Sequence, residues 1–119
     1  MPNFNQSRKT ADRLIARWGG GKGQGELQRA DVRRTVTVAI NEYKPTERAL
    51  VLEGSRRALV SALDPDTGDI LATPPDHELD QFLIYAGQKF RLVAPDRGPR
   101  PDGNAVFHDL EVQYDSRDV

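Results

Sequence analysis

The stretch VRRTVTVAINE, residues 32–42, decides the fold class of this chain of 119 residues. Val36, Val38 and Ile40 alternate with smaller or polar residues, which places the apolar side chains on one face of an extended strand. β-branched residues fit a pleated, half-buried surface, so the composition also favours a strand. Pro45 follows the stretch and is expected to end it, because proline cannot donate to a strand ladder.

Further short segments with the composition or alternation of strands lie on either side of this stretch. They are residues 26–29, 56–63, 81–85, 88–93 and 105–114. Ala86-Gly87 joins two of them as a tight hairpin, and residues 64–79 and 95–104 form long connections rich in proline and glycine. Short strands joined by turns predict a mainly β domain, a small antiparallel β-barrel or sandwich over 26–114, with a long acidic inter-strand loop over 64–79. The polar tail from Asp115 is expected to fray.

One helix is predicted before the strands, over residues 5–18. Its apolar residues recur at helical spacing and form one stripe: Ala11, Leu14, Ile15 and Trp18. Gly19 is expected to end the helix in the left-handed conformation, and residues 19–25 (GGGKGQG) to act as a flexible linker or loop. The apolar stripe therefore either packs on the sheet of the same chain or docks on a neighbouring protein. In the second case the helix would become ordered on assembly.

Composition excludes several classes of protein. The chain has no cysteine, which excludes disulfide scaffolds, thiolate catalysis and cysteine-bound zinc. No apolar run approaches the roughly 18 residues that span a bilayer, and residues 1–10 lack the apolar core of a signal peptide. We therefore expect a single domain over residues 1–119, made in the cytoplasm and without membrane contact.

The residue types that carry catalysis form no recognisable constellation. The glycine run reads Gly21-Lys22-Gly23 and lacks the Ser or Thr that a nucleotide-binding loop needs after its lysine. Asp76-His77-x-x-Asp80 supplies at most half of a metal site, and His108 and Asp109 would face opposite sides of a strand. The sequence predicts no enzyme, no cofactor and no metal site.

The net charge of −1 conceals two opposed blocks along the chain. Residues 1–34 carry eight Lys or Arg against three Asp or Glu, a balance of +5. Residues 64–80 carry six Asp or Glu and no Lys or Arg, a balance of −6. Opposed charge on one small chain indicates complementary contact with another copy or another charged partner, or else two solvated faces.

The order of these features resembles one family of virion proteins. Residues 7–19 (SRKTADRLIARWG) are similar to its N-terminal helix, and residues 26–29 (ELQR) to its first short strand. Residues 56–62 (RRALVSA) resemble its basic-then-apolar strand. Asp80, Gly87 and residues 89–93 (KFRLV) are similar to its closing hairpin, and residues 106–114 to its last strand. The family is that of the small head–tail joining proteins of tailed phages, the head-completion, neck or stopper proteins also found in prophages and gene transfer agents.

The resemblance implies a small β-barrel with a helix and a long loop that assembles as a ring, of six or twelve copies, in the neck of the virion. Such a ring meets portal or adaptor proteins above and tail-terminator or tail proteins below. It closes the DNA-filled head and lets double-stranded DNA pass without specific binding.

Site residues follow from this reading. A ring requires one surface of each copy to match a different surface of the next. The expected interface residues are Arg13, Arg17, Trp18, Arg56 and Arg57. The acidic loop is expected to line the channel, where its carboxylates repel passing phosphates: Asp64, Asp66, Asp69 and Asp76.

Two other functions stay open on the sequence alone. A tail-terminator or minor tail protein would also be small, ring-forming and rich in strands. A small β-barrel that binds nucleic acid would use the basic helix to contact phosphates. The isoelectric point of about 6.1 and the scarcity of aromatic residues argue against a dedicated nucleic-acid-binding module.

Overall fold

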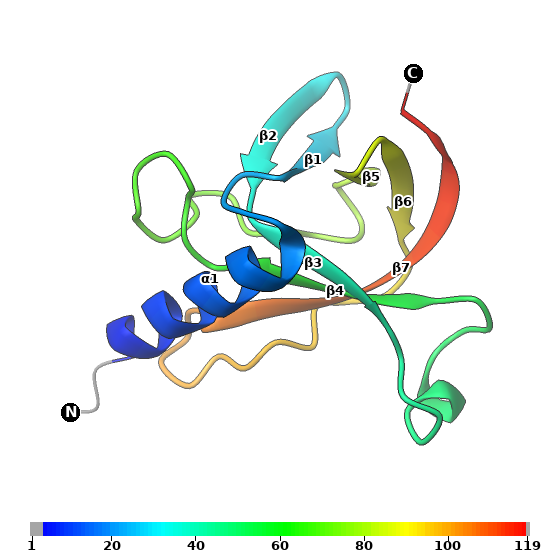
Figure 1. The fold of residues 1–119 in the computed structure, drawn as a ribbon, viewed down its shortest axis with the longest axis horizontal. Helices are drawn as coiled ribbons and strands as arrows, with labels where there is room; N and C mark the ends of the chain where they lie inside the picture. Colours follow the sequence, from blue (N-terminus) through cyan, green and yellow to red (C-terminus); the bar gives the residue numbers. More distant parts are fainter. Residues whose placement is uncertain (1–3, 119) are drawn as a thin grey trace.

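The computed structural model describes residues 4–118 and confirms that the chain is mainly β with one N-terminal α-helix in that range (Figure 1). In chain order the elements are α1 (Asn5–Gly19), β1 (Gly25–Arg29), β2 (Val32–Val36), β3 (Val38–Glu42), the 3-10 turn η1 (Arg48–Leu50), β4 (Arg56–Ser61), β5 (Phe82–Tyr85), β6 (Gln88–Leu92) and β7 (Phe107–Arg117). The seven strands build one antiparallel sheet that curls into a half-barrel, rather than a two-sheet sandwich.

An interruption at Thr37 separates the two edge strands of the half-barrel. The strand order is β2-β1-β5-β6-β7-β4-β3, so that two strands consecutive in the chain form the two edges of the sheet. The single strand predicted over 32–42 is therefore wrong, because the chain leaves one edge of the sheet at Val36 and joins the other edge at Val38. Thr37 is fully buried. Its carbonyl accepts the N–H of Ser61, and its hydroxyl accepts the N–H of Gly23.

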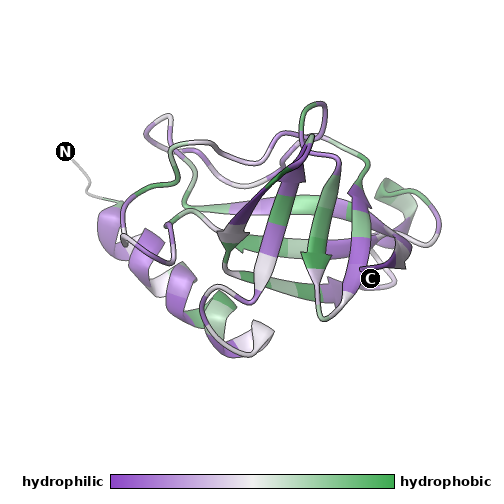
Figure 2. Cartoon of the chain, turned by 90° about the horizontal axis from the view of Figure 1, so that it is seen from above, coloured by the Kyte–Doolittle hydropathy of each residue, from purple (hydrophilic) through white to green (hydrophobic). Residues whose placement is uncertain are grey.

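The inner side of the curled sheet holds the apolar core. Apart from Leu71, which lies in the connection between β4 and β5, the core residues lie in strands and alternate within them, as the period of two predicts. They are Leu27, Val36, Val38, Ala58, Val60, Leu71, Leu83, Phe90, Leu92, Leu110 and Val112. Figure 2 shows the resulting hydrophobic bands across the strands, while most of the helix is hydrophilic.

The C-terminal end of the chain is more ordered than the sequence predicted. β7 runs to Arg117, and it pairs with β4 over its first half and with β6 over its second half. The N–H of Asp118 donates to the carbonyl of Gly87, so the tail from Asp115 is held to the sheet instead of fraying. Val119 lies outside the described residues.

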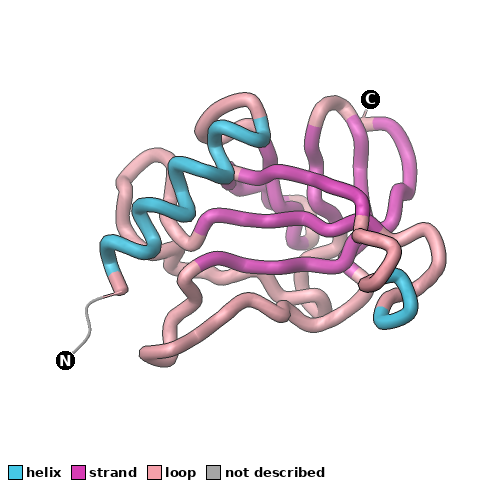
Figure 3. The backbone as a smooth tube through the Cα atoms, turned by 60° about the horizontal axis from the view of Figure 1, so that its bottom comes forward, coloured by secondary structure: helices cyan, strands magenta, loops and turns pink. Residues whose placement is uncertain are grey.

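α1 lies across the outer side of the sheet, against β3, β4 and β7 (Figure 3). This settles one open question, since the helix packs on the sheet of its own chain. The long connections over 62–81 and 93–106 consist of turns, bends and irregular segments, with one isolated bridge between Leu63 and Ile70.

Candidate interaction surface

α1 contacts the sheet through a stripe that differs from the apolar stripe predicted. The buried residues of the helix are Arg8, Asp12, Ile15, Ala16 and Gly19. The last four lie one position after the predicted set of 11, 14, 15 and 18. One residue turns an α-helix by about 100°, so the predicted stripe is wrong by a quarter of a turn. Only Ile15 belongs to both stripes.

Two charged side chains hold this stripe on the sheet. Arg8 is only 2% exposed, and its guanidinium donates to the carbonyls of Ala105 and Asn104 and to the carboxylate of Asp102. Asp12 accepts the hydroxyl of Ser61 at 2.6 Å and pairs with the ammonium of Lys22 at 3.2 Å. A buried charge is costly unless it is paired and hydrogen-bonded. These bonds therefore fix the rotation of the helix.

The glycine-rich segment 19–25, predicted as a flexible linker or loop, is the loop that connects the end of α1 to the start of β1. Gly20, not Gly19, takes the left-handed conformation that ends the helix, with φ of 90°. Gly19 serves a close approach, since a Cβ at this position would lie 1.9 Å from the carbonyl oxygen of Val38. The hydroxyl of Tyr85 donates to the carbonyl of Gly19 at 2.8 Å. These two contacts hold the C-terminal end of α1 against β3 and β5.

The rotation of the helix leaves apolar and cationic side chains outside. Leu14 is 40% exposed and Trp18 is 58% exposed. Lys9, Arg13 and Arg17 lie four residues apart, are all exposed, and form no ion pair with any other residue of 4–118. We call these five residues the helix face. It contains three of the five predicted interface residues.

The other two predicted interface residues start β4, away from the helix face. Arg57 is already engaged, because its guanidinium donates to both carboxylate oxygens of Asp109 at 3.1 and 2.9 Å. This hydrogen bonding raises the pKa of Arg57 above its usual value. Arg56 is exposed and stands opposite Glu42 in the register of β3 and β4. The structure therefore does not bring the five residues together.

The predicted channel residues fall into two parts. Asp64, Asp66 and Asp69 share one turn, closed by a backbone hydrogen bond of 2.7 Å from Asp64 to Asp69 and by the N–H of Asp66 on the Asp64 carboxylate. None of the three forms an ion pair in the described part of the chain. Asp76 belongs to the next segment, where its carboxylate accepts the N–H of Glu78.

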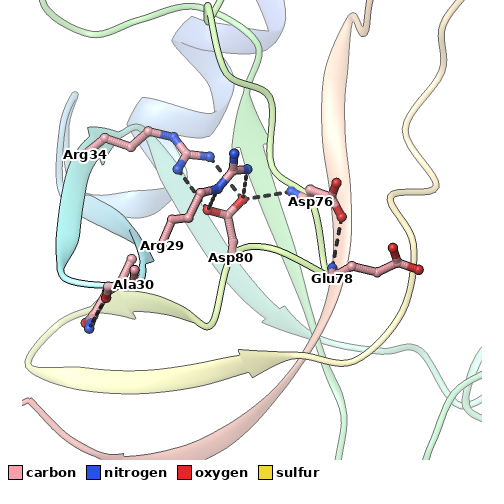
Figure 4. A network of polar contacts seen from close by, with 7 residues as sticks. Arg29, Ala30, Arg34, Asp76, Glu78 and Asp80 are labelled. Carbon is pink, nitrogen blue, oxygen red and sulfur yellow. Dashed lines mark hydrogen bonds and ion pairs between the residues drawn. The ribbon is translucent and has the colours of Figure 1, made fainter.

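Asp80 joins the two charge blocks inside one molecule (Figure 4). Its buried carboxylate accepts four hydrogen bonds from Arg29 and Arg34, at 2.8 to 3.3 Å, and a fifth from the N–H of Asp76. Burial opposes the ionisation of Asp80, but the hydrogen bonds from the two arginines outweigh it and lower the pKa. Part of the opposed charge is thus neutralised within the chain, and the helix face and the turn of Asp64 keep theirs.

A second buried carboxylate fixes the connection between β6 and β7. Asp96 lies 2.6 Å from Nδ1 of His108 and accepts the N–H groups of Gly98 and Asp109, both at 2.8 Å. Burial opposes the ionisation of Asp96, but these hydrogen bonds outweigh it and lower the pKa from 3.8 to about 2. Carbonyl groups of the same connection accept hydrogen bonds from Arg8, so Asp96 helps to position the segment on which α1 packs.

Residues 43–55 form an arm between β3 and β4 for which the sequence predicted no role. The buried carboxylate of Glu111 holds its base by accepting the N–H of Leu52 at 3.0 Å and the hydroxyl of Ser55 at 2.8 Å. Two leucines of the arm reach solvent: Leu50 is 79% exposed, and Leu52, although its N–H is held at the base, is 58% exposed. The available signal was the apolar run over 49–52, which lacks the alternation of a strand.

Other kinds of site find little support. Across residues 4–118, no three His, Asp or Glu side chains come together as a possible metal site. No helix in this range is both long enough and apolar enough to cross a membrane. No family model, curated protein or solved structure is significantly similar to the chain.

Proposed function

We propose that this chain is a structural protein of a tailed phage or a related particle, and that copies of it form a ring at the head–tail junction. The ring closes the DNA-filled head and presents a platform for the tail. The observation that carries the proposal is the helix face: a helix held rigidly by buried polar bonds displays Trp18 and two arginines to solvent. The half-barrel with its N-terminal helix agrees with the fold that the sequence resemblance implies.

The composition of the helix face suits a protein partner. Exposed apolar groups rimmed by charge are typical of protein–protein contacts, and Trp and Arg contribute most to the energy of such contacts. A helix that served only its own sheet would gain stability by turning about 100° to bury Leu14 and Trp18. The polar bonds of Arg8 and Asp12 prevent that rotation and keep the face available.

The turn of Asp64, Asp66 and Asp69 is proposed to face the channel of the ring. Its carboxylates have no cationic partners in residues 4–118, so they would repel the phosphates of passing DNA and prevent adhesion. The triple variant D64N/D66N/D69N should release DNA more slowly during ejection or lose it from filled heads. The D76N variant is the matched control, because that carboxylate caps the N–H of Glu78 instead. Normal ejection and retention by the triple variant would contradict a channel position.

The nucleic-acid-binding alternative is weaker in the light of the surface. The three cations of the helix face would attract phosphates. Lys9 and Asp69 line one surface depression, however, and Arg13 and Asp64 line another. The acidic turn beside the helix therefore repels the ligand that the cations would attract.

Particle assembly without the protein tests the proposal. Deletion of the gene should give DNA-filled heads that lack tails or that lose their DNA, visible by negative-stain electron microscopy. The protein should be present in purified complete particles and absent from isolated tails. Its presence on isolated tails would favour a tail-terminator, and its absence from complete particles would overturn the proposal.

A further inference from the structure

A small pocket of about 180 Å³ lies between the two long connections and β7. Its apolar wall comes from the first connection and includes Ala62, Ile70 and Leu71. The N–H of Leu71 donates to the carbonyl of Ala62 at 2.8 Å, and Ile70 forms the isolated bridge with Leu63. The wall is therefore ordered without a ligand, and no residue of the helix face belongs to it.

The imidazole ring of His108 lines this pocket and is fixed by a buried carboxylate. Its Nδ1 lies 2.6 Å from Asp96, which stays ionised because its pKa is about 2. An ionised carboxylate only accepts hydrogen bonds, so Nδ1 carries the proton. Asp96 does not line the pocket, so the ring meets it through the edge away from Nδ1, which carries Nε2. Nε2 forms no hydrogen bond with any residue of 4–118.

Two further polar side chains line the same pocket, Arg100 and Asn104. One terminal nitrogen of Arg100 donates to Asp96 at 2.8 Å. The other nitrogens of this guanidinium and the side-chain amide of Asn104 form no hydrogen bond within the described part of the chain. An apolar pocket on which a few polar groups converge is typical of a site for a small molecule.

We infer that this pocket binds a small carboxylic acid, with its carboxyl group between Nε2 of His108 and the guanidinium of Arg100. Arg100 donates to one carboxyl oxygen, and the other oxygen shares a proton with Nε2. A carboxyl group offers both an acceptor and a proton, whereas an amide of the same shape has no proton to give up. An apolar cavity of about 150 Å³ holds a benzene molecule, so the acid should have about the size of isobutyrate.

Binding of the acid takes up one proton. Near neutral pH the acid arrives as a carboxylate, and the charge of Arg100 is already paired with Asp96. Protonation of His108 supplies the second positive charge, so that two cations face two carboxylates in the occupied site. Histidine is the side chain that changes its charge most readily near neutral pH. The affinity should therefore fall as the pH rises.

The elements packed around His108 add no competing charge to the pocket. β4 places the apolar Val60 opposite His108 in the register of β4 and β7. The other charged groups of the surrounding elements have partners or line the neighbouring depression: Arg8 paired with Asp102, Asp109 paired with Arg57, and Asp76 and His77 in the depression beside Arg100. His108 is therefore the group whose protonation should follow binding.

Imidazole NMR signals test the inference directly, because the chain has only two histidines and H77Q assigns them. Isobutyrate should move the His108 signals toward those of a protonated ring, and isobutyramide, its neutral analogue, should not. The affinity for isobutyrate should fall roughly tenfold for each pH unit above about pH 7. Unmoved His108 signals, or an affinity that does not depend on pH, would overturn the inference.

Substitutions separate the roles of the two side chains. R100Q should weaken isobutyrate binding about tenfold, because it removes a charged donor. R48Q is the matched control, since Arg48 is an exposed arginine of the arm without an ion pair in residues 4–118, and it should bind as the wild type does. H108Q keeps a donor for Asp96 but cannot titrate, so its remaining binding should not depend on pH. Arg100 is exposed, so R100Q should fold, and an affinity equal to that of the wild type would contradict the site.

Two sources supply this carboxyl chemistry, a free small acid and an acidic side chain of another protein. N-acetylglutamate amide carries a side-chain carboxyl on a peptide backbone and is compared with isobutyrate in the same titration. Tighter binding of isobutyrate would identify a free acid, and tighter binding of the glutamate derivative would identify a side chain. Binding of neither would overturn the inference. The proposed ring does not depend on this pocket, so particles of R100Q should assemble normally whatever the titration shows.

Discussion

The two sides of α1 reverse the usual distribution of charged and large apolar side chains. Arg8 and Asp12 face the sheet, whereas Leu14 and Trp18 face solvent. The buried side gains its hold from directed hydrogen bonds to Ala105, Asn104 and Ser61. The exposed side presents the large side chains of Leu14 and Trp18, which no other residue of 4–118 fully covers.

The difference separates two tasks of one helix. Polar bonds fix the orientation of α1 on its own sheet together with the buried Ile15 and Ala16, and the larger side chains of Leu14 and Trp18 stay exposed, where we propose that another molecule binds. The half-barrel core makes no such separation, since the strands bury their apolar side chains on the inner side of the sheet of the same chain. An apolar stripe on a helix therefore identifies a contact surface without showing whether the contact lies in the same chain.

Replacing Arg8 should have the largest effect on stability. Arg8→Ala leaves the carbonyls of Asn104 and Ala105 without their donor and removes a fully buried side chain, whereas the partly exposed Asp102 carboxylate keeps the N–H of Asn104. The unsatisfied carbonyls and the lost packing together cost about 4 kcal/mol. Urea unfolding followed by circular dichroism should show this loss. Arg13→Ala, the same change on the other side of the same helix, should alter the unfolding free energy by less than about 0.5 kcal/mol. Equal effects would contradict the assignment of the two sides.

Gly19→Ala should come next, with a sign opposite to helix propensity. Alanine favours a helix over glycine by about 1 kcal/mol. At this position its Cβ would meet the carbonyl oxygen of Val38 at 1.9 Å, so helix and sheet must separate. Such overpacking costs about 3 kcal/mol. Gly20→Ala should cost only about 1 kcal/mol, from its positive φ, since no atom lies near the added methyl group. A stabilising Gly19→Ala, measured by thermal unfolding, would show that the close approach is not required.

Much of the fold follows from local patterns in the sequence. The strands of the half-barrel are visible because apolar residues alternate in β3, β6 and β7 and because turns separate them. The interruption at Thr37 is not visible, since the alternation continues through it. Thr37 is held there by tertiary hydrogen bonds to Gly23 and Ser61, which no local pattern encodes.

The candidate site was predictable in part. Arg13, Arg17 and Trp18 are exposed, as a predicted interface requires. The predicted apolar stripe, however, lies about 100° around the helix from the buried stripe. Periodicity assumes that apolar side chains face the sheet, and Arg8 with its three partners in the 102–105 segment, some 97 residues away, overrides that assumption. The ion pair between Arg57 and Asp109 depends on the pairing of β4 with β7, which the sequence does not reveal.

The stability that Asp96 gives to the connection beneath α1 should also depend on pH. The pKa of Asp96 is lowered from 3.8 to about 2 in the folded chain, where His108 and Arg100 contact its carboxylate. A carboxyl with a lowered pKa stabilises the fold above the unfolded pKa, and this contribution is lost as pH falls through the folded pKa. The difference in unfolding free energy between the wild type and Asp96→Asn should therefore shrink by about 2 kcal/mol between pH 5 and pH 2. A difference that does not change with pH would show that Asp96 is not the titrating group.

The smallest effect on stability is expected on the exposed side of α1. A small effect there sharpens the comparison between the two sides of the helix. Trp18→Ala should change the unfolding free energy by less than about 0.5 kcal/mol, measured by circular dichroism, because the side chain is mostly solvated. The same variant should lose self-association about tenfold or more if Trp18 is an anchor of the interface. Leu79→Ala, a change of an exposed apolar residue outside the helix face, is the matched control and should leave association unchanged. A substitution that leaves folding intact and abolishes assembly separates the two tasks of α1. A Trp18→Ala variant that unfolds easily would instead place the side chain in the packing of its own chain.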